Sequence, residues 1–578
     1  MIFNSMRRLI RVVFSAAIAC CVILPLGLRA QDSVDLILHN ARVVTVDDEL
    51  PEAEAVAVQG DKILAVGSNE EIRRLGNSET RQIDLGGRLV IPGFIEGHAH
   101  FVGLGQSRMM LDLKTAKSWQ DVVDQVAEAT KTTPKGQWIV GRGWHQEKWD
   151  EVPQENVEGY PVTSKIDEVA PDHPVLLTHA SGHACFANSF AMQLAGVNNT
   201  TANPNGGEIL RGENGAATGV FRETAMGLVN RAKTRADAKM SDEDNALLLE
   251  RAIELAGEEC IKKGVTSFQD AGSSFGTVAG LKQAAEAGKL KTRLWVMIRS
   301  SNELLTIGLP KAKLIGHADN FLTVRAVKVS IDGALGAHGA WLLAPYEDLP
   351  NSVGLNTVTI ESAERTADLC IEHDFQFCVH AIGDRANREV LDIFEEAFKS
   401  SPREDSRRWR VEHAQHLNPD DIPRFGELGV IASMQGVHCT SDAIFVLQRL
   451  GTRRAAEGAY VWQKLLKSGA VVTNGTDAPV EDLDPLASFY STVSRKIKDG
   501  SRFFEDQRMS RAEALKSYTL DCAYAAFEEE IKGSITQGKL ADLVVLSKDI
   551  MSCEEDEIPD AKVDMTIVGG EVVYQREQ

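Results

Sequence analysis

Leu89-Val-Ile-Pro-Gly-Phe-Ile-Glu-Gly-His-Ala-His100 is an apolar strand that ends in two histidines, His98 and His100, separated by one residue. Side chains two apart in a strand point to the same face, so both imidazoles can reach one metal ion. One such pair is weak evidence by itself, because many histidines lie on surfaces or in cores without binding metal. Its place at the end of an apolar strand makes the pair a candidate metal site.

Ligand-type residues also end three later apolar strands. These strand ends are Phe377-Cys-Val-His380, Arg410-Val-Glu-His413 and Val472-Thr-Asn-Gly-Thr-Asp477. The carboxyl ends of parallel strands converge on one face of a barrel, where barrel enzymes assemble their sites. Each residue alone could be a satisfied core histidine or a helix cap, but together they indicate one shared site.

A further candidate, Lys328, is flanked by apolar residues in Val324-Arg-Ala-Val-Lys-Val-Ser-Ile-Asp332. A buried lysine is costly unless it is paired or chemically altered. One outcome is an ion pair with Asp332 or another acid. The other is a carbamate formed with carbon dioxide, which turns the cation into an anionic ligand with two oxygens.

Most of the chain alternates short apolar strands with amphipathic helices, a pattern typical of βα units and a parallel sheet. Two clear helices, 241–263 and 510–527, each begin at a serine that can cap the first free amides. The stretch from about 105 to 250 is long and rich in loops, and we expect it to be an insertion. The two ends of the chain differ, because residues 31–92 and 528–578 contain alternating strands and tight turns without clear helices. We predict that both ends form one small β-sandwich domain.

The first 30 residues predict a secretory signal peptide. Arg7, Arg8 and Arg11 precede an apolar run over 12–26, and a small residue, Ala30, stands before Gln31. The alternative is a membrane anchor, but the run is shorter than the ~20 residues that a helix needs to cross a bilayer. We therefore expect an exported protein, periplasmic or secreted, without a stable membrane span after cleavage. The seven cysteines that follow are scattered, contain no CxxC and do not indicate a disulfide framework.

The composition argues for a globular protein and against a nucleic-acid partner. The 578 residues are 43% hydrophobic and 25% charged, and the formal net charge is -21 with both signs interspersed. A phosphate backbone would therefore be repelled on average. A homodimer is a further expectation, because it is the commonest closed assembly, although no residue of the sequence shows one.

In their order, His98-x-His100, Lys328, His380, His413 and Asp477 resemble the metal-ligand set of the amidohydrolase superfamily. Other stretches resemble its amidohydrolase-3 branch, which contains the YtcJ-like proteins and the N-substituted formamide deformylases. Those stretches are Gly206-Gly-Glu-Ile-Leu-Arg, Ala217-Thr-Gly-Val-Phe-Arg-Glu223, Lys328 to Gly336, His380-Ala-Ile-Gly-Asp384, Arg410-Val-Glu-His-Ala-Gln415, Thr476-Asp-Ala-Pro-Val480 and Gly538-Lys-Leu-Ala-Asp-Leu-Val-Val545.

The resemblance implies a (β/α)8 TIM-type barrel over residues 93–527 that holds one or two divalent metal ions. Zinc is the expected metal. By this resemblance His98, His100 and Asp477 bind one ion. His380 and His413 bind a second, and a carbamylated Lys328 bridges the two. Asp477 then also takes a proton from the attacking water and passes it to the leaving nitrogen. No organic cofactor is implied.

His438 stands where a family member would contact the substrate or its developing oxyanion, and the alternative is an ordinary loop histidine. His183 also matches the branch and could reach the site from the insertion. His145 and Trp144 fit loop packing better than a site, and we leave them out of the catalytic set.

Three positions depart from the family pattern. Gly97 follows Glu96 where an acid often lies directly beside the first histidine, and Gly436 stands where proline is common. Ala337-His338 replaces a frequent Ser-Arg. Gly436 and the Ala337-His338 pair are expected to line the pocket.

The functional hypothesis is hydrolysis of a carbon–nitrogen bond in a small molecule, whether a non-peptide amide, an N-formyl compound or a cyclic amide. The same site could attack an ester, a lactone or a phosphotriester, and the sequence does not separate these substrates. A metal-binding protein without catalysis is a third hypothesis, which the presence of every ligand disfavours.

Overall fold

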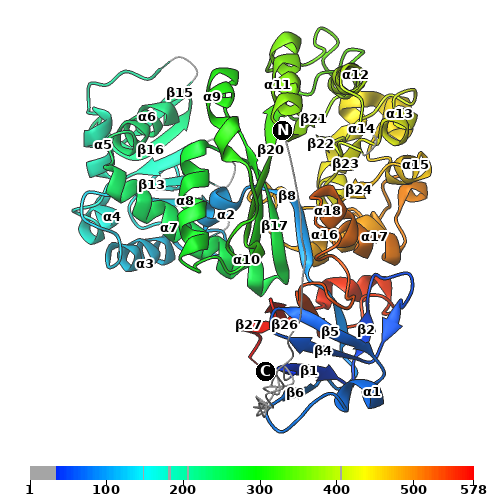
Figure 1. Cartoon of the computed structure of the whole chain (residues 1–578). Coiled ribbons are helices and arrows are strands. Elements are labelled where there is room, and N and C mark those ends of the chain that lie inside the picture. Colours follow the sequence, from blue (N-terminus) through cyan, green and yellow to red (C-terminus); the bar gives the residue numbers. More distant parts are fainter. Residues whose placement is uncertain are drawn as a thin grey trace, which may run out of the picture.

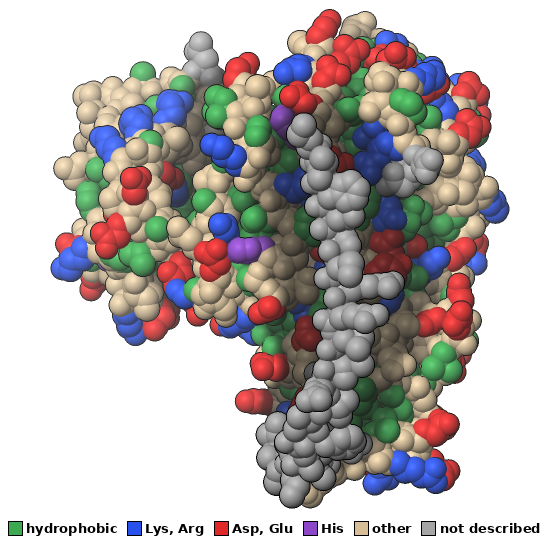
Figure 2. Space-filling view, viewed as in Figure 1, with side chains coloured by type: hydrophobic (Ala, Val, Ile, Leu, Met, Phe, Trp, Pro, Cys, Tyr) green, Lys and Arg blue, Asp and Glu red, His purple; other side chains and the backbone are tan. Residues whose placement is uncertain are grey.

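The computed structural model describes residues 34–577 except 147–148, 180–183, 205–206, 337 and 404–405. The predicted signal peptide, His183 and Ala337 lie outside these described residues. Within them, no helix is both long enough and apolar enough to cross a membrane. Acidic and basic side chains are interspersed over the face shown in Figure 2.

The predicted α/β barrel is confirmed, because eight parallel strands follow one another around a nearly closed sheet (Figure 1). Each strand pairs in parallel with the next one in chain order. The strands are β8 (Phe94–Ala99), β17 (Val265–Ser273), β18 (Arg293–Ile298), β20 (Leu322–Ser330), β21 (Gln376–Ala381), β22 (Arg410–His413), β23 (Ile431–Ser433) and β24 (Val472–Thr473).

Helices connect these strands and cover the outside of the barrel (Figure 1). They are α2 (Phe101–Arg108), α7 (Asp242–Lys262), α8 (Phe275–Glu286), α9 (Asn302–Ala312), α11 (Ile360–Glu372), α12 (Asp384–Ser400), α13 (Ile422–Leu428), α14 (Gly436–Gly458), α15 (Trp462–Lys467), α16 (Pro485–Ser494), α17 (Arg511–Ser517) and α18 (Leu520–Ala525). Short elements between them are β19 (Leu314–Gly316), α10 (His317–Asn320) and η2 (Glu505–Gln507). The predicted helix 241–263 is present as α7, and the Ser241 side chain accepts from the Asp244 amide.

Alternation along the strands separates two apolar layers. On β18, Leu294, Val296 and Ile298 belong to the large core shared with the helices. Trp295 and Met297 belong instead to a small cluster that contains side chains from β17, β20 and β21. Because neighbouring residues of a strand point to opposite faces, this small cluster is the barrel interior.

The barrel closes where β8 meets the segment after β24. The Gly97 amide donates to the Asn474 carbonyl at 3.0 Å, and the Asp477 amide donates to the His98 carbonyl at 2.8 Å. A Cβ on Gly97 would lie 2.4 Å from the Asn474 oxygen. Glycine is therefore required at residue 97 by the close approach of the two backbones.

The prediction of one continuous helix over 510–527 is wrong, because the segment forms two helices, α17 and α18. The carbonyls of Ser517 and Tyr518 turn toward the barrel, where they accept from the amides of Asn474 and Ile95 at 3.0 and 2.8 Å. Bonds to the closing strands thus replace the bonds that would continue the helix.

Strands from both ends of the chain form a pair of sheets below the barrel in Figure 1. The first contains β5 (Lys62–Gly67), β4 (Ala55–Gln59), β1 (Leu36–His39) and β6 (Arg81–Asp84), with α1 (Asn69–Arg73) beside it. The second contains β27 (Glu571–Gln575), β26 (Val563–Val568), β25 (Leu543–Leu546), β7 (Leu89–Pro92), β2 (Arg42–Val44) and β3 (Glu52–Ala53); η3 (Glu555–Asp560) precedes β26. One apolar core, which includes Leu38 and Ile567, joins the two sheets.

A separate six-stranded sheet lies between α2 and α7 in the chain, on the left of Figure 1. Its strands are β15 (Gly207–Arg211), β16 (Ala217–Glu223), β14 (Ala184–Ala187), β13 (Val175–His179), β10 (Ile139–Trp144) and β9 (Leu111–Asp112). The same segment contains the pair β11 (Asn156–Val157) and β12 (Tyr160–Pro161) and the helices α3 (Trp119–Thr130), α4 (Ser164–Val169), α5 (Ser189–Ala195) and α6 (Met226–Asp237). Two apolar clusters of its own lie within it.

We predict that Gly97→Ala lowers the free energy of unfolding by about 1–3 kcal/mol, because the added methyl group pushes β8 away from Asn474. Guanidinium denaturation followed by fluorescence measures the change. Gly276→Ala is the matched control, since a Cβ there meets only Ser274 Oγ at 3.7 Å. Equal stability of the two variants would contradict the importance of this close approach.

Candidate metal centre

The ligand-type residues predicted from the sequence gather at the carboxyl ends of the barrel strands. His98 lies in β8 and His100 directly follows that strand, while His413 is the last residue of β22. His380 lies near the end of β21, and Asp477 follows β24. This is the face of a barrel where side chains from different strands can meet at one point.

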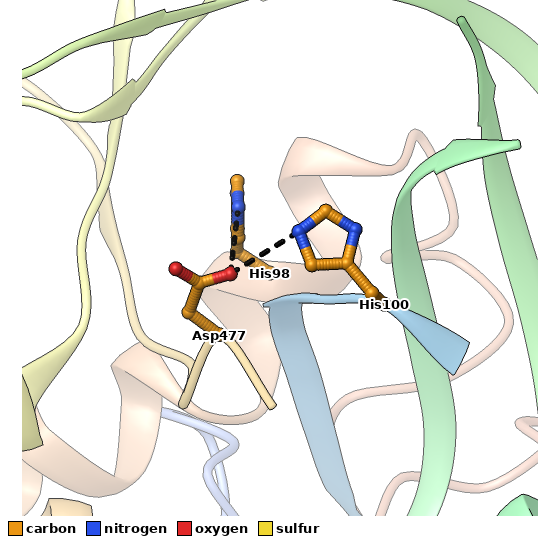
Figure 3. Close-up of side chains that lie close together, drawn as sticks. All are labelled: His98, His100 and Asp477. Carbon is orange, nitrogen blue, oxygen red and sulfur yellow. Dashed lines mark ion pairs between the residues drawn. The ribbon is translucent and has the colours of Figure 1, made fainter. Parts of the chain in front are cut away.

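Asp477 lies at the centre of the cluster. Its Oδ1 is 3.6 Å from His98 Nε2 and 3.4 Å from His100 Nε2 (Figure 3). The ring of His413 lies 4.6 Å from that of His98 and 4.4 Å from that of His380, measured between centroids. The structure therefore brings together four of the predicted histidines and the aspartate.

Two groups of ligand atoms are close enough to hold a cation. One consists of His98, His100 and Asp477, and the other of His413, His438 and Asp477, with all atoms of a group within 4.8 Å of one another. Asp477 belongs to both. His438, which the sequence assigned to substrate contact, thus faces the same centre as the other histidines.

Unusual backbone conformations aim two of these side chains. His413 has φ +78° and Asp477 has φ +58°, in the left-handed region that residues other than glycine rarely adopt. Glu412 and His413 are neighbours in one strand, so regular alternation would point them in opposite directions. The left-handed turn at His413 breaks the alternation and lets both side chains face the site, at a cost of about 1–3 kcal/mol.

Two histidine rings are fixed through their Nδ1 atoms. His98 Nδ1 bonds to the Glu412 carboxylate, and His413 Nδ1 lies 2.8 Å from Gln435 Oε1. The Gln435 amide is itself oriented, because its Nε2 donates to the Ser433 carbonyl at 3.2 Å. Each acceptor keeps the proton on Nδ1 and leaves the Nε2 lone pair free for a metal ion.

Asp332 organises the loop beside His380 instead of pairing with Lys328. Its carboxylate accepts from the amides of Ile382, Gly383 and Trp341 at 3.0, 2.8 and 2.9 Å. Its Oδ1 also lies 3.4 Å from His380 Nε2. The ion pair considered for Lys328 and Asp332 is absent, and Lys328 forms no ion pair with any residue that the structure describes.

Burial controls the protonation of the centre. Burial lowers the pKa of His98 to about 4, and it lowers the pKa of His413 and of Lys328. It also raises the pKa of Glu412, but the contact with His98 and the charges of Lys328 and Arg410 outweigh it and bring that pKa down to about 2. The centre therefore contains neutral imidazoles beside an ionised carboxylate, the forms that bind metal.

Several polar atoms of the centre have no hydrogen-bond partner among the described residues. They are His380 Nε2, His438 Nε2 and Asp477 Oδ1, all buried. Buried polar atoms are normally satisfied, so a group of them at one point indicates a ligand. Imidazole nitrogens with a carboxylate oxygen fit zinc and similar divalent ions.

The comparisons with known proteins agree with this geometry. The sequence model of the family described as the amidohydrolase family matches residues 81–574. The chain belongs to the amidohydrolase family. Its relatives include the protein LONG AFTER FAR-RED 3 of Arabidopsis thaliana, 34% identical over 93% of this chain and 91% of that protein. The putative amidohydrolase YtcJ of Bacillus subtilis is 31% identical over 93% and 99%.

Two further similarities concern activity and fold. The N-substituted formamide deformylase of Arthrobacter pascens is 27% identical over 94% of this chain and 98% of that enzyme. An uncharacterized metal-dependent hydrolase from Pyrococcus furiosus, known from its crystal structure, is 27% identical in sequence. The two structures align over 89% of this chain and 100% of that chain with a TM-score of 0.71. This amidohydrolase-family chain thus shares its fold with metal-dependent hydrolases.

Glu96 supports the segment that carries Asp477, a role that the sequence did not reveal. Its Oε1 accepts from the Thr476 amide at 2.7 Å, and its Oε2 accepts from the Thr476 hydroxyl at 3.0 Å. Burial raises the pKa of Glu96 to about 8. Glu412 and Gln435 were also missed, although an acid directly before His413 in a buried strand was a usable signal.

Gly436, one of the positions that depart from the family pattern, has a structural explanation. The Gly436 amide donates to Asn474 Oδ1 at 2.8 Å, which a proline could not do, and a Cβ there would lie 2.2 Å from Thr492 Oγ1. His338 lies 3.2 Å from Asp348 Oδ1. In the insertion, Trp144 is fully buried and its Nε1 donates to the Leu177 carbonyl at 2.9 Å, as expected for packing.

We predict that Gln435→Leu weakens zinc binding by about 10–100-fold, because His413 loses the acceptor that orients its ring. Competition with a chromogenic zinc chelator measures the affinity. Gln435→Glu retains an acceptor oxygen at the same place and should lose much less. Unchanged affinity in the leucine variant would show that His413 is not oriented through Nδ1.

Proposed function

We propose that this protein hydrolyses a carbon–nitrogen bond in a small molecule, whether a non-peptide amide, an N-formyl compound or a cyclic amide. The observation that carries the proposal is the convergence of His98, His100 and Asp477 on one point of the barrel mouth. The similarity to an N-substituted formamide deformylase over nearly the whole chain supports the choice of bond. Export to the periplasm or the medium is a proposal that rests on the sequence of the first 30 residues. A homodimer is proposed only because it is the commonest closed assembly.

The residues present fit a metal ion. By the resemblance to the family, His98, His100 and Asp477 would hold one ion and His380 and His413 would hold a second, with a carbamylated Lys328 as a ligand of both. When bound, a divalent ion polarises the scissile carbonyl and lowers the pKa of water from about 15.7 toward 7. Zinc suits this mixture of nitrogen and oxygen donors.

Asp477 is the proton carrier in this proposal. Its Oδ1 has no hydrogen-bond partner among the described residues and faces His98 and His100, so it can accept a proton at the centre. The leaving nitrogen of an amide must be protonated before it departs, and the same carboxyl group can supply that proton. The backbone bond from the Asp477 amide to the His98 carbonyl fixes its position.

His438 would stabilise the carbonyl oxygen of the substrate. Its ring is buried and roughly parallel to that of His413, at 6.3 Å between centroids, and its Nδ1 contacts Gln415 Nε2 at 3.1 Å. In this proposal its Nε2 binds the substrate and not a metal ion, because the Gln415 amide donates to Nδ1 and leaves the proton on Nε2. A hydrogen bond from this atom to the developing oxyanion would be stronger in the transition state than in the ground state.

We predict about two metal ions per chain by elemental analysis of the purified protein, falling sharply in Lys328→Ala and in Lys328→Met. The methionine variant fills the lysine's space but cannot form a carbamate. One metal ion that persists in both variants would indicate a single site in which Lys328 has another role. No metal in the unmodified protein would contradict the proposed mechanism.

We also predict that Asp477→Asn lowers kcat by at least about 10²–10⁴-fold while the fold is retained, because the amide cannot carry the proton. Activity is measured on a panel of formamides, cyclic amides, esters, lactones and phosphotriesters, and the fold is checked by circular dichroism. Turnover retained in the variant would exclude this role of Asp477. Activity confined to the esters or phosphotriesters would mean that the protein hydrolyses that class of bond and not a carbon–nitrogen bond.

A further inference from the structure

An arginine that the metal centre does not use lies at the same end of the barrel. Arg299 directly follows β18, and its amide continues the strand pairing by donating to the Ser273 carbonyl at 2.9 Å. Trp295 and Met297 of this strand face the barrel interior. Since side chains two apart share a face, Arg299 also points inward, in the layer nearest to solvent.

Contacts with the next strand place the Arg299 guanidinium beside the centre. Its Nη2 donates to Ser330 Oγ at 3.3 Å, and Ser330 lies opposite His380 in the pairing of β20 with β21. Ser330 is also two residues after Lys328 and therefore shares its inward face. The guanidinium thus reaches across the mouth toward the strand ends that carry Lys328 and His380.

Gly272 makes room for this arrangement. Its φ is +138°, and a Cβ there would meet Arg299 Cβ and Cδ at 3.2 Å and Lys328 Cγ at 3.6 Å. Gly272 therefore lies between the side chains of Arg299 and Lys328, and these two side chains are no farther apart than the breadth of one side chain. A larger residue at this position would push Arg299 away from the mouth.

Arg299 has no acidic partner among the described residues. It is exposed and forms no ion pair there, although the whole protein carries a net charge of -21. Arg293, at the opposite end of the same strand, is buried and bonds to Asp542 at 2.8 Å through its Nε. A guanidinium has a planar fork of donors that matches a carboxylate, and no described carboxylate pairs with that of Arg299.

We propose that Arg299 and Ser330 form an anion subsite that binds a carboxylate of the substrate beside the scissile bond. The inference rests on the proposed function and narrows it to amides that carry a carboxylate, such as N-formyl or other N-acyl amino acids. The guanidinium donates two hydrogen bonds to the carboxylate oxygens, and the Ser330 hydroxyl keeps the fork oriented. Binding at the rim then holds the amide carbonyl over the metal centre.

Equilibrium binding tests the subsite without turnover. Calorimetry on the full, zinc-loaded protein compares 3-phenylpropanoate with 3-phenylpropan-1-ol, which differ in the anionic group and contain no carbon–nitrogen bond. The carboxylate should bind about 10–100-fold more tightly, a preference that charge-assisted hydrogen bonds can supply. Arg299→Met should remove most of this preference. Arg74→Met, which removes an exposed arginine paired with Glu70, should keep it.

Two outcomes would overturn the subsite. Equal binding of the acid and the alcohol means that the mouth has no anion site. A preference that persists in Arg299→Met means that the carboxylate is bound elsewhere, for example by the metal.

Turnover separates this inference from the proposed function. N-formyl-L-phenylalanine and N-formyl-2-phenylethylamine differ only by a carboxylate, and we expect kcat/KM to favour the acid by about 10–100-fold in the unmodified protein and in Arg74→Met. The ratio should fall toward one in Arg299→Met. Hydrolysis of both formamides at equal rates would refute the subsite alone. Hydrolysis of neither, with the carboxylate preference in binding intact, would count against formamide hydrolysis and leave the subsite standing.

Discussion

Backbone hydrogen bonds across the barrel seam are the constraint on which the centre depends. Glu96 and Thr476, which bond to each other there, are 380 residues apart in the sequence. The bonds from Gly97 to Asn474 and from Asp477 to His98 place the first and the last ligand-type residues against each other. The carbonyls of Ser517 and Tyr518, at the end of α17, accept bonds from the seam and complete the closure. Without this seam, His98 and Asp477 would belong to unconnected edges of an open sheet.

The centre concentrates features that oppose folding. Left-handed backbone at His413 and Asp477 and the unsatisfied polar atoms each cost about 1–3 kcal/mol. The apolar core between the strands and the helices offsets these costs, because it contains most of the buried hydrophobic side chains of the barrel. A metal ion would satisfy the lone pairs and the carboxylate together, so its binding would also stabilise the fold.

The sequence predicted which ligand-type residues lie at the strand ends, but not the contacts that orient their side chains. Alternation in an apolar strand predicted that His98 and His100 share a face. Short strands alternating with helices predicted a parallel sheet, and the closed barrel was implied by the resemblance to the family. The sequence could not predict the left-handed turn at His413, or that Gln435 accepts a hydrogen bond from the His413 ring. Both depend on contacts between strands that are far apart in the chain. The same reason explains the broken helix at Tyr518. Arg299 belongs to no sequence motif, and only the pairing of β18 with β20 shows that it lies at the barrel mouth.

The junction between β7 and β8 has a consequence for how the protein is made. β7 pairs with β25, and only Gly93 separates it from β8, which carries His98. Gly93 is confined on both sides, since its amide donates to the Asp542 carbonyl at 2.9 Å and a Cβ would lie 2.1 Å from Thr266 Oγ1. The first barrel strand is therefore anchored by a strand that the ribosome makes near the end of translation. The sheet that contains β7 therefore cannot be completed until residues 543–575 have emerged from the ribosome.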